Sequence, residues 1–186
     1  MFGGTFDPVH RAHLRVAGEA ARARVLDRVL FIPAAWPPHK SGATGASYED
    51  RYRMVQLACA GEPKFEVSRL EAASETSYSI ETIERVKATL APGDELFFLI
   101  GADAFSEIRT WYRWRDVTHE VQFIVVSRPG HRYAVPDGAR VERLESVLLP
   151  TSSSDLRARL AAGEEPAELV APVLAYIREH GLYRGR

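Results

Sequence analysis

The amino-acid sequence predicts an α/β protein with a single doubly wound, mostly parallel sheet. Apolar runs typical of buried strands alternate with segments of helical periodicity, and glycine or proline follows several of the runs. This alternation is typical of a parallel sheet covered by helices on both faces. The sequence contains no repeat, linker or low-complexity segment, so we expect one domain over residues 1–186.

The composition is that of a globular protein, with 46% hydrophobic and 26% charged residues. A formal net charge of −1 offers no broad basic surface for nucleic acid. The only cysteine, Cys59, lies in an apolar helical stretch, which favours a buried side chain over a reactive thiol and rules out an intrachain disulfide. No apolar run approaches the roughly 18 residues of a membrane span. We expect a cytoplasmic protein with neither nucleic-acid nor membrane partners.

The first element is a glycine-rich loop that leads into a helix, at residues 3–13 (GGTFDPVHRAH). Paired glycines allow close approach of a ligand, Asp7-Pro8 favours a turn, and the apolar positions Leu14, Ala17, Ala21 and Val25 predict a helix from about His10. A helix N-terminus suits phosphate oxygens. His10 and His13 then share one face of the first turn. A plain turn and helix with two surface histidines fits the same spacing, whereas zinc fits less well because no third ligand is near.

A loop of this kind usually follows a buried strand of about 5 residues. Only Met1 and Phe2 precede it here. We therefore expect a first strand that is shortened at the N-terminus, with the natural start upstream.

The next elements alternate as the fold class requires. The apolar run at 28–33 predicts a strand covered on both faces, and the long loop at 34–46 is rich in proline and glycine. Ser47, with Asp50 three residues later, predicts the N-cap of a helix over 48–60. A strand at 65–70 and a helix at 79–90, stopped by Pro92-Gly93, follow.

The second half begins with the strongest strand signal, at 95–100. A short helix over 104–108 comes next, then a strand at 121–126 that Arg128-Pro129-Gly130 closes. A short strand within 141–149 precedes a helix that begins after Ser154. The last helix is expected over 166–180, with Gly181 as its stop.

Three loops follow predicted strands and converge at one edge of the sheet. They are the glycine loop, the loop at 34–46, and Gly101-Ala102-Asp103. Ligands of doubly wound sheets collect at this edge. Asp103 either accepts a hydrogen bond from a ribose hydroxyl or caps the helix at 104–108, and both roles are compatible.

The sequence GGTFDPVH at 3–10, followed by His13, resembles the signature of the nucleotidyltransferase superfamily with a paired-histidine motif, His-x-Gly-His. Ala12 stands where most members have glycine. The resemblance implies a Rossmann-like nucleotidyltransferase fold. It also implies that ATP lies against Gly4, Thr5, Phe6, His10, His13, Gly101 and Asp103.

The sequence PPHK at 37–40, after Trp36, would by itself be a solvated turn. Within the superfamily it resembles the bacterial nicotinate-nucleotide adenylyltransferases. That resemblance implies that Lys40 neutralises nucleotide phosphates, with His39 nearby.

The sequence SSSDLR at 152–157 by itself indicates a capped helix with a solvated arginine. It also resembles the superfamily's C-terminal serine and arginine motif. This resemblance implies that Ser153 and Arg157 hold the β- and γ-phosphates of ATP.

Residues 76–82 (TSYSIET) and 110–114 (TWYRW) resemble the acceptor side of the same adenylyltransferases. Without the resemblance, Trp111 and Trp114 are core or rim aromatics. With it, Trp111 stacks on a pyridine ring, the Tyr112 N–H binds the carboxylate, and Ser79 replaces the usual threonine. Thr5 and Lys40 complete the implied site for nicotinate mononucleotide.

The resemblance therefore implies transfer of AMP from ATP to nicotinate mononucleotide. His10, His13, Lys40 and Arg157 are the implied catalytic residues, and Mg²⁺ arrives on the ATP phosphates without a protein metal site. The alternatives are transfer to nicotinamide mononucleotide or phosphopantetheine, and a nucleotide-binding protein without turnover. The sequence leaves a homo-oligomer open.

Overall fold

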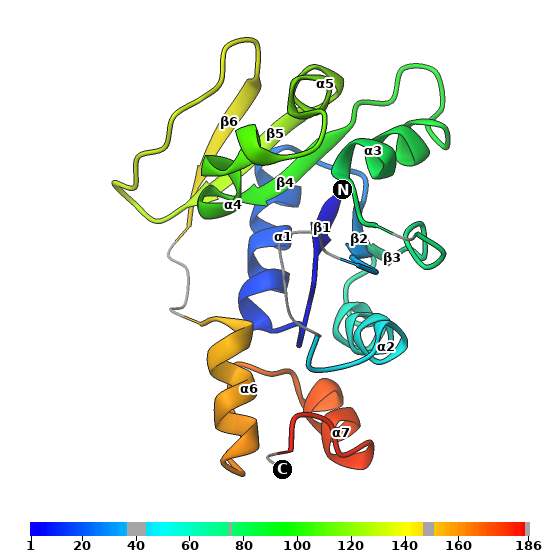
Figure 1. Ribbon diagram of the computed structural model, residues 1–186, viewed down its shortest axis with the longest axis vertical. Helices are drawn as coiled ribbons and strands as arrows, with labels where there is room; N and C mark the ends of the chain where they lie inside the picture. Colours follow the sequence, from blue (N-terminus) through cyan, green and yellow to red (C-terminus); the bar gives the residue numbers. More distant parts are fainter. Residues whose placement is uncertain (37–43, 75, 147–150, 185–186) are drawn as a thin grey trace.

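Six parallel strands form one sheet in the order β3-β2-β1-β4-β5-β6 (Figure 1). The computed structural model describes residues 1–36, 44–74, 76–146 and 151–184. The strand order reverses at β1, which pairs with β2 on one side and β4 on the other. This topology confirms the predicted doubly wound sheet and puts its switch point beside the glycine loop.

The first half of the chain supplies one side of the sheet. Its elements are β1 (Phe2–Gly4), α1 (Arg11–Ala23), β2 (Val29–Pro33), α2 (Tyr48–Cys59) and β3 (Phe65–Val67). The Ser47 hydroxyl accepts a hydrogen bond from the Asp50 N–H at 3.1 Å, so α2 begins as predicted. Although β1 is short, Phe2 pairs with Phe31 of β2 and Leu99 of β4, which places β1 centrally.

The second half supplies the other side. Its elements are α3 (Ser79–Lys87), β4 (Phe97–Gly101), α4 (Ala102–Ser106), a 3-10 turn (Ile108–Thr110), α5 (Trp114–Glu120), β5 (Gln122–Ser127) and β6 (Arg140–Glu145). The sequence did not predict α5, because seven residues are too few to show a helical period. Its start is fixed by Arg113, which has φ +51° and donates to Asp116 Oδ2 at 2.6 Å.

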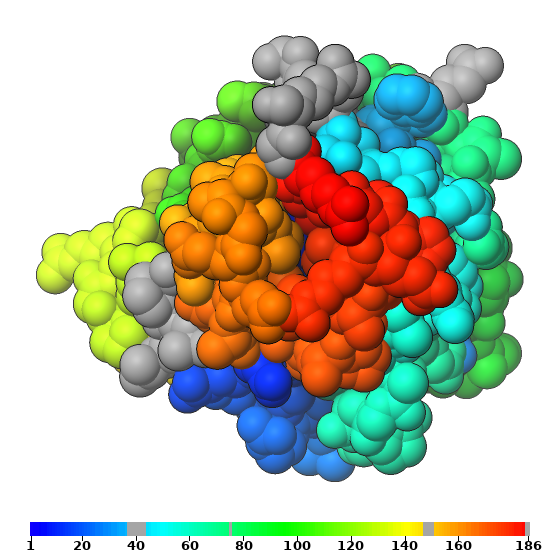
Figure 2. All heavy atoms as spheres, turned by 90° about the horizontal axis from the view of Figure 1, so that it is seen from below, coloured from blue at the N-terminus to red at the C-terminus, as the bar shows by residue number. Residues whose placement is uncertain are grey.

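Helices α6 (Ser153–Ala161) and α7 (Ala171–Glu179) lie together at one end of the molecule (Figures 1 and 2). The Tyr176 hydroxyl of α7 donates to Asp50 Oδ1 of α2 at 3.0 Å. The predicted start of the last helix at 166 is wrong, because the backbone carbonyls of Ala167 and Glu168 accept hydrogen bonds from Arg11. No described helix is long and apolar enough to span a membrane.

The core has two parts, one on each face of the sheet. Buried side chains of α1, α2 and α7 gather on one face, and those of α3, α4 and α5 on the other. Cys59 is buried as predicted, and burial raises the pKa of its thiol to about 12. Both faces of the sheet are therefore covered, as the apolar strands require.

Val25 does not extend the apolar face of α1, contrary to prediction. The helix ends at Ala23, and Val25 is 80% exposed with φ +49°. The Leu26 N–H donates to Ala21 O at 2.9 Å, which closes the helix before Val25 can join it. A β-branched residue at positive φ is strained.

Candidate active site

The two predicted histidines meet at the start of α1. His10 is the N-cap residue, and its backbone N–H donates to Nδ1 of His13 at 3.2 Å. The two ring centroids lie 3.8 Å apart. The prediction that both imidazoles share the first turn is therefore confirmed.

His10 is a buried, neutral imidazole at pH 7. Its residue is 5% exposed, and burial lowers its pKa from 6.5 to about 4, opposed in part by Glu168. Among the described residues its Nδ1 has no hydrogen-bond partner. His10 can thus offer a neutral ring to a ligand, but no positive charge.

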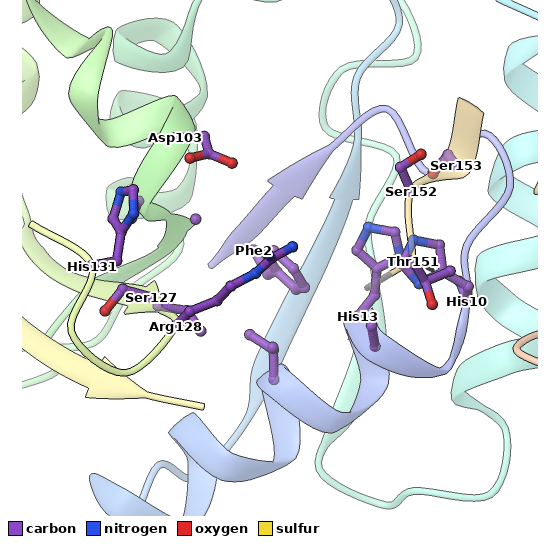
Figure 3. Close-up of a pocket in the computed structure, with 15 residues that line it drawn as sticks. Phe2, His10, His13, Asp103, Ser127, Arg128, His131, Thr151, Ser152 and Ser153 are labelled. Atoms are coloured by element: carbon purple, nitrogen blue, oxygen red, sulfur yellow. Dashed lines mark hydrogen bonds between the residues drawn. The ribbon is translucent and has the colours of Figure 1, made fainter. Parts of the chain in front are cut away.

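The histidines line a cavity of about 720 Å³ (Figure 3). Figure 3 shows His10, His13, Ser152 and Ser153 on one side and Asp103 and His131 on the other. The volume falls within the range of small-molecule sites, about 300–1,000 Å³. The lining residues are Phe2, His10, Ala12, His13, Val16, Gly101, Ala102, Asp103, Val126, Ser127, Arg128, His131, Thr151, Ser152 and Ser153.

Gly101 and Asp103 enter the cavity at the end of β4, as the convergence of loops predicted. The expected cap at Asp103 is wrong, because α4 begins at Ala102 and Gly101 is its N-cap residue. Asp103 lies within the first turn and is exposed. Its carboxylate faces the cavity as a hydrogen-bond acceptor (Figure 3).

Helix α6 brings a second N-terminus to the same cavity. The Ser152 hydroxyl caps it by accepting from the Asp155 N–H at 3.1 Å. The Ser153 hydroxyl donates to Pro8 O at 3.1 Å, which joins α6 to the glycine loop. Two helix starts, α1 and α6, therefore flank one space, an arrangement that suits an extended anion.

Arg157 does not line this cavity. Its guanidinium donates to the backbone oxygen of Asp7 at 2.7 Å and to the Ser154 hydroxyl at 3.3 Å, and it lies 3.6 Å from the Asp7 carboxylate. The structure thus places Arg157 behind the glycine loop, one helical turn from Ser153.

The glycine loop itself packs inward. Phe6 is 2% exposed, and its ring lies edge-on to His13 at 5.1 Å. A Cβ atom on Gly4 would approach the Phe6 ring to 3.0 Å, so any larger residue there would force this buried ring to shift. Among the predicted ATP-site residues, Gly4, Thr5 and Phe6 therefore lie next to the cavity and do not line it.

The predicted acceptor residues form a separate group. Trp36 exchanges two hydrogen bonds with Ser77, both at 3.0 Å, directly before Ser79 at the start of α3. The rings of Tyr78 and Tyr112 are 4.5 Å apart. The structure thereby joins the 34–36, 76–79 and 111–112 segments. Lys40 and His39 lie outside the described residues.

The predicted acceptor residues are connected to the glycine loop through Phe98 of β4. The Trp111 ring lies 6.1 Å from that of Phe98, and a Cβ atom on Gly3 would lie 3.9 Å from the Phe98 ring. The acceptor residues and the histidine cavity are therefore placed near opposite sides of β1.

Several residues that line the cavity were not predicted from the sequence, namely Ser127, Arg128, His131 and Thr151. Arg128 and His131 come from the loop after β5. The signal was available, since this loop also follows a parallel strand near the switch point. Arg128 adds the cation that His10 does not provide.

Known proteins resemble the whole chain. The cytidylyltransferase-like family model matches residues 1–159. A protein of Solibacter usitatus named "Probable nicotinate-nucleotide adenylyltransferase" is 60% identical over 183 residues, covering 98% of this chain and 97% of that protein. A protein of the same name from Thermus thermophilus is 39% identical, with coverage of 99% and 98%.

A solved structure resembles the fold. Plasmodium falciparum nicotinic acid mononucleotide adenylyltransferase complexed with NaAD is similar with a TM-score of 0.80 and 20% identity. The match covers 98% of this chain and 95% of that one.

Proposed function

The chain belongs to the nicotinate-nucleotide adenylyltransferases within the cytidylyltransferase-like family, and we propose that it transfers AMP from ATP to nicotinate mononucleotide. The products are nicotinate adenine dinucleotide and pyrophosphate, in NAD biosynthesis. One observation carries the proposal: the starts of α1 and α6, with His10 and His13, share a cavity with Asp103 at the end of β4. A triphosphate suits the first group and a ribose the second.

The reaction exchanges one phosphorus–oxygen bond for another. An oxygen of the acceptor's 5′-phosphate attacks the α-phosphorus of ATP in line, and the bond from that phosphorus to the bridging oxygen breaks. Pyrophosphate leaves with the electron pair. Because the attacking phosphate is already a nucleophile, catalysis consists of positioning and charge stabilisation, without a covalent enzyme intermediate.

His13 and His10 contact the α-phosphate region in this mechanism. The position of both rings at the start of α1 supports these roles. Since burial holds the pKa of His10 at about 4, His10 acts through a neutral N–H. Charge compensation then comes from the helix start, Arg128 and Mg²⁺ that enters bound to the ATP phosphates.

The pyrophosphate contacts are proposed for Ser153, Arg157 and Lys40. Ser153 lines the cavity, which supports its role. For Arg157, the guanidinium exchanges its hydrogen bond to Asp7 O for a phosphate oxygen. Lys40 is proposed on the sequence resemblance alone.

The predicted acceptor residues, which include Ser79, Trp111 and Tyr112, bind nicotinate mononucleotide. Trp111 stacks on the pyridine ring, while the Tyr112 N–H and the Ser79 hydroxyl bind its carboxylate, and Thr5 also contacts the mononucleotide. The link from Trp111 through Phe98 to Gly3 supports a site beside the glycine loop. We propose a cytoplasmic location, which the single, buried Cys59 supports.

Pyrophosphate release with ATP and each of three acceptors tests the function. We expect kcat/KM for nicotinate mononucleotide to exceed that for nicotinamide mononucleotide at least about 100-fold, because the amide leaves carboxylate donors unpaired. Phosphopantetheine should not react. Equal use of the amide would overturn the carboxylate site and keep the chemistry. ATP binding without turnover would instead favour a non-catalytic nucleotide-binding protein, with Ala12 in the cavity as the first residue to restore to glycine.

A further inference from the structure

Arg51 is a buried arginine that neither the histidine cavity nor the acceptor group explains. It lies in α2 and is 1% exposed. Its guanidinium donates to Thr5 O at 2.8 Å, to Ala34 O at 2.7 Å and to Ala35 O at 3.4 Å. All three hydrogen-bond acceptors are backbone carbonyl oxygens, so Arg51 binds the main chain and not another side chain.

These carbonyls belong to the two loops that the reaction must bring together. Thr5 follows β1 in the glycine loop, on the ATP side. Ala34 and Ala35 follow β2 and lead to Trp36, which pairs with Ser77 on the acceptor side. The Arg51 guanidinium therefore links the glycine loop to the acceptor loop (residues 34–36), and it adds to the backbone hydrogen bond from the Ala34 N–H to Gly4 O at 2.9 Å.

Glu71 extends the connection to α3. The residue is 6% exposed, and its carboxylate accepts from the Ala35 N–H at 3.4 Å and from the Thr82 hydroxyl at 2.6 Å. Thr82 lies one turn after Ser79. The glycine loop, residues 34–35 and the start of α3 are thus joined through two buried charged side chains.

Burying these charges costs free energy, which an apolar pair would avoid. Asp7 and Glu71 are the acids whose field favours the Arg51 charge, and the Tyr48 ring lies 5.7 Å from its guanidinium carbon. What the charges supply in return is geometry: a planar fork that reaches three carbonyls at fixed angles.

We propose that Arg51 and Glu71 are positioning residues that hold the acceptor loop against the glycine loop, so that the two phosphates meet in line. The inference rests on the proposed function. It gives a role to a buried arginine that lies under the two loops and does not line the cavity.

Kinetics of Arg51→Lys and Glu71→Gln provide the first test. Lysine keeps the charge but cannot span three carbonyls, and glutamine keeps the shape but replaces one of the two acceptor oxygens of Glu71 by an NH₂ donor. We expect kcat to fall about 100-fold, as for a misplacement of about 1 Å. The dissociation constants of ATP alone and nicotinate mononucleotide alone should stay within about threefold, because each half-site remains.

Matched controls are Arg53→Lys, an exposed arginine on the same helix, and Glu66→Gln, an exposed glutamate of β3. Both should keep kcat within about twofold. A wild-type kcat in Arg51→Lys and Glu71→Gln overturns the inference, as does a kcat that falls only with the folded fraction measured by circular dichroism.

Hydrogen exchange of the Ala34, Ala35 and Trp36 amides tests the positioning without any substrate. We expect exchange at least about 10-fold faster in Arg51→Lys and Glu71→Gln, because the loop loses its anchor. If wild type does not use nicotinate mononucleotide, the proposed function fails, and the exchange rates alone decide the inference. Unchanged exchange overturns it.

A third variant covers the case in which the charge variants do not fold. Thr82→Val removes the hydroxyl that bonds Glu71 at 2.6 Å and Tyr78 O at 3.3 Å. Thr118→Val is its matched control, a buried threonine of α5 whose hydroxyl likewise bonds a carbonyl of its own helix, Arg115 O. Faster exchange and lower kcat in Thr82→Val alone support the inference. Identical behaviour of the two overturns it.

Discussion

The Tyr183 hydroxyl donates a hydrogen bond to Asp7 Oδ1 at 2.7 Å, across 176 positions of sequence. The same carboxylate accepts from the backbone N–H groups of Gly45 at 2.7 Å and Ala46 at 3.1 Å. Asp7 therefore ties the glycine loop to the end of the 34–46 loop and to the C-terminal segment. Crowding agrees with this, since a Cβ atom on Gly45 would lie 2.8 Å from both Arg157 and Tyr183.

Tyr183→Phe should destabilise the protein by about 1.5–3 kcal/mol, the usual contribution of a hydrogen bond to a charged group. Burial and the Asp7 carboxylate raise the pKa of Tyr183, so its hydroxyl stays a donor at all physiological pH values. Urea unfolding at pH 7 measures the free energy.

Tyr48→Phe is the matched control, because the Tyr48 hydroxyl is buried and has no hydrogen-bond partner among the described residues. Its removal should leave stability unchanged or raise it slightly. If both variants lose the same free energy, the contact between Tyr183 and Asp7 does not stabilise the fold.

The sequence could predict those parts of the fold that local patterns encode. The apolar runs of β2, β4 and β5 and the Ser47 cap of α2 were found where expected. Val25 was wrongly assigned to the apolar face of α1, because apolar periodicity does not indicate the residue at which a helix ends. Nothing local marks Asp7 as a junction, because its partners come from residues 45, 46 and 183.

The candidate site also contains some residues that local sequence patterns predict and others that they do not. His10 and His13 were predictable because three residues of helix place them together. The position of the 128–131 loop after a parallel strand could have marked it as part of the site, but a loop carries no period that singles out Arg128 and His131 within it. The neutral state of His10 also depends on burial, which spacing alone does not specify.

The depressed pKa of His10 predicts a pH dependence of stability. In the folded protein the pKa is about 4, against 6.5 for an ordinary histidine, so the unfolded chain binds more protons between these values. His10 therefore destabilises the fold as pH falls from about 6.5 to 4, by up to about 3 kcal/mol at the lower limit. Above pH 7 the effect is absent.

His10→Asn should remove this dependence, because asparagine serves as an N-cap but does not titrate. Urea unfolding from pH 7 to pH 4 should show wild type losing more stability than the variant. Parallel curves, or a His10 pKa near 6.5 by NMR titration, would contradict the assignment.

His13→Ala should lower kcat about 10²–10³-fold, by analogy with the loss of one donor to a developing charge. It should also cost about 1 kcal/mol of stability, because His13 Nδ1 accepts the His10 N–H at the start of α1. Steady-state pyrophosphate release and thermal unfolding measure the two effects. The control is His119→Ala, at the exposed end of α5, which should change neither kcat nor stability appreciably. Full activity in His13→Ala would contradict the catalytic role of His13.

Arg128→Met should raise the KM for ATP about 10-fold and leave the KM for nicotinate mononucleotide nearly unchanged. Arg128 is exposed and lines the cavity (Figure 3), whereas Ser79, Trp111 and Tyr112 do not line it. A hydrogen bond from a charged donor contributes about 1.5–3 kcal/mol when well formed, and solvent exposure reduces this toward the tenfold effect expected here.

Arg132→Met removes the same charge from an exposed position outside the cavity lining, so it separates the loss of a local contact from a general loss of positive charge. Equal KM shifts in the two variants would mean that Arg128 attracts ATP only through the overall field, and the salt dependence of KM would then be the same for both.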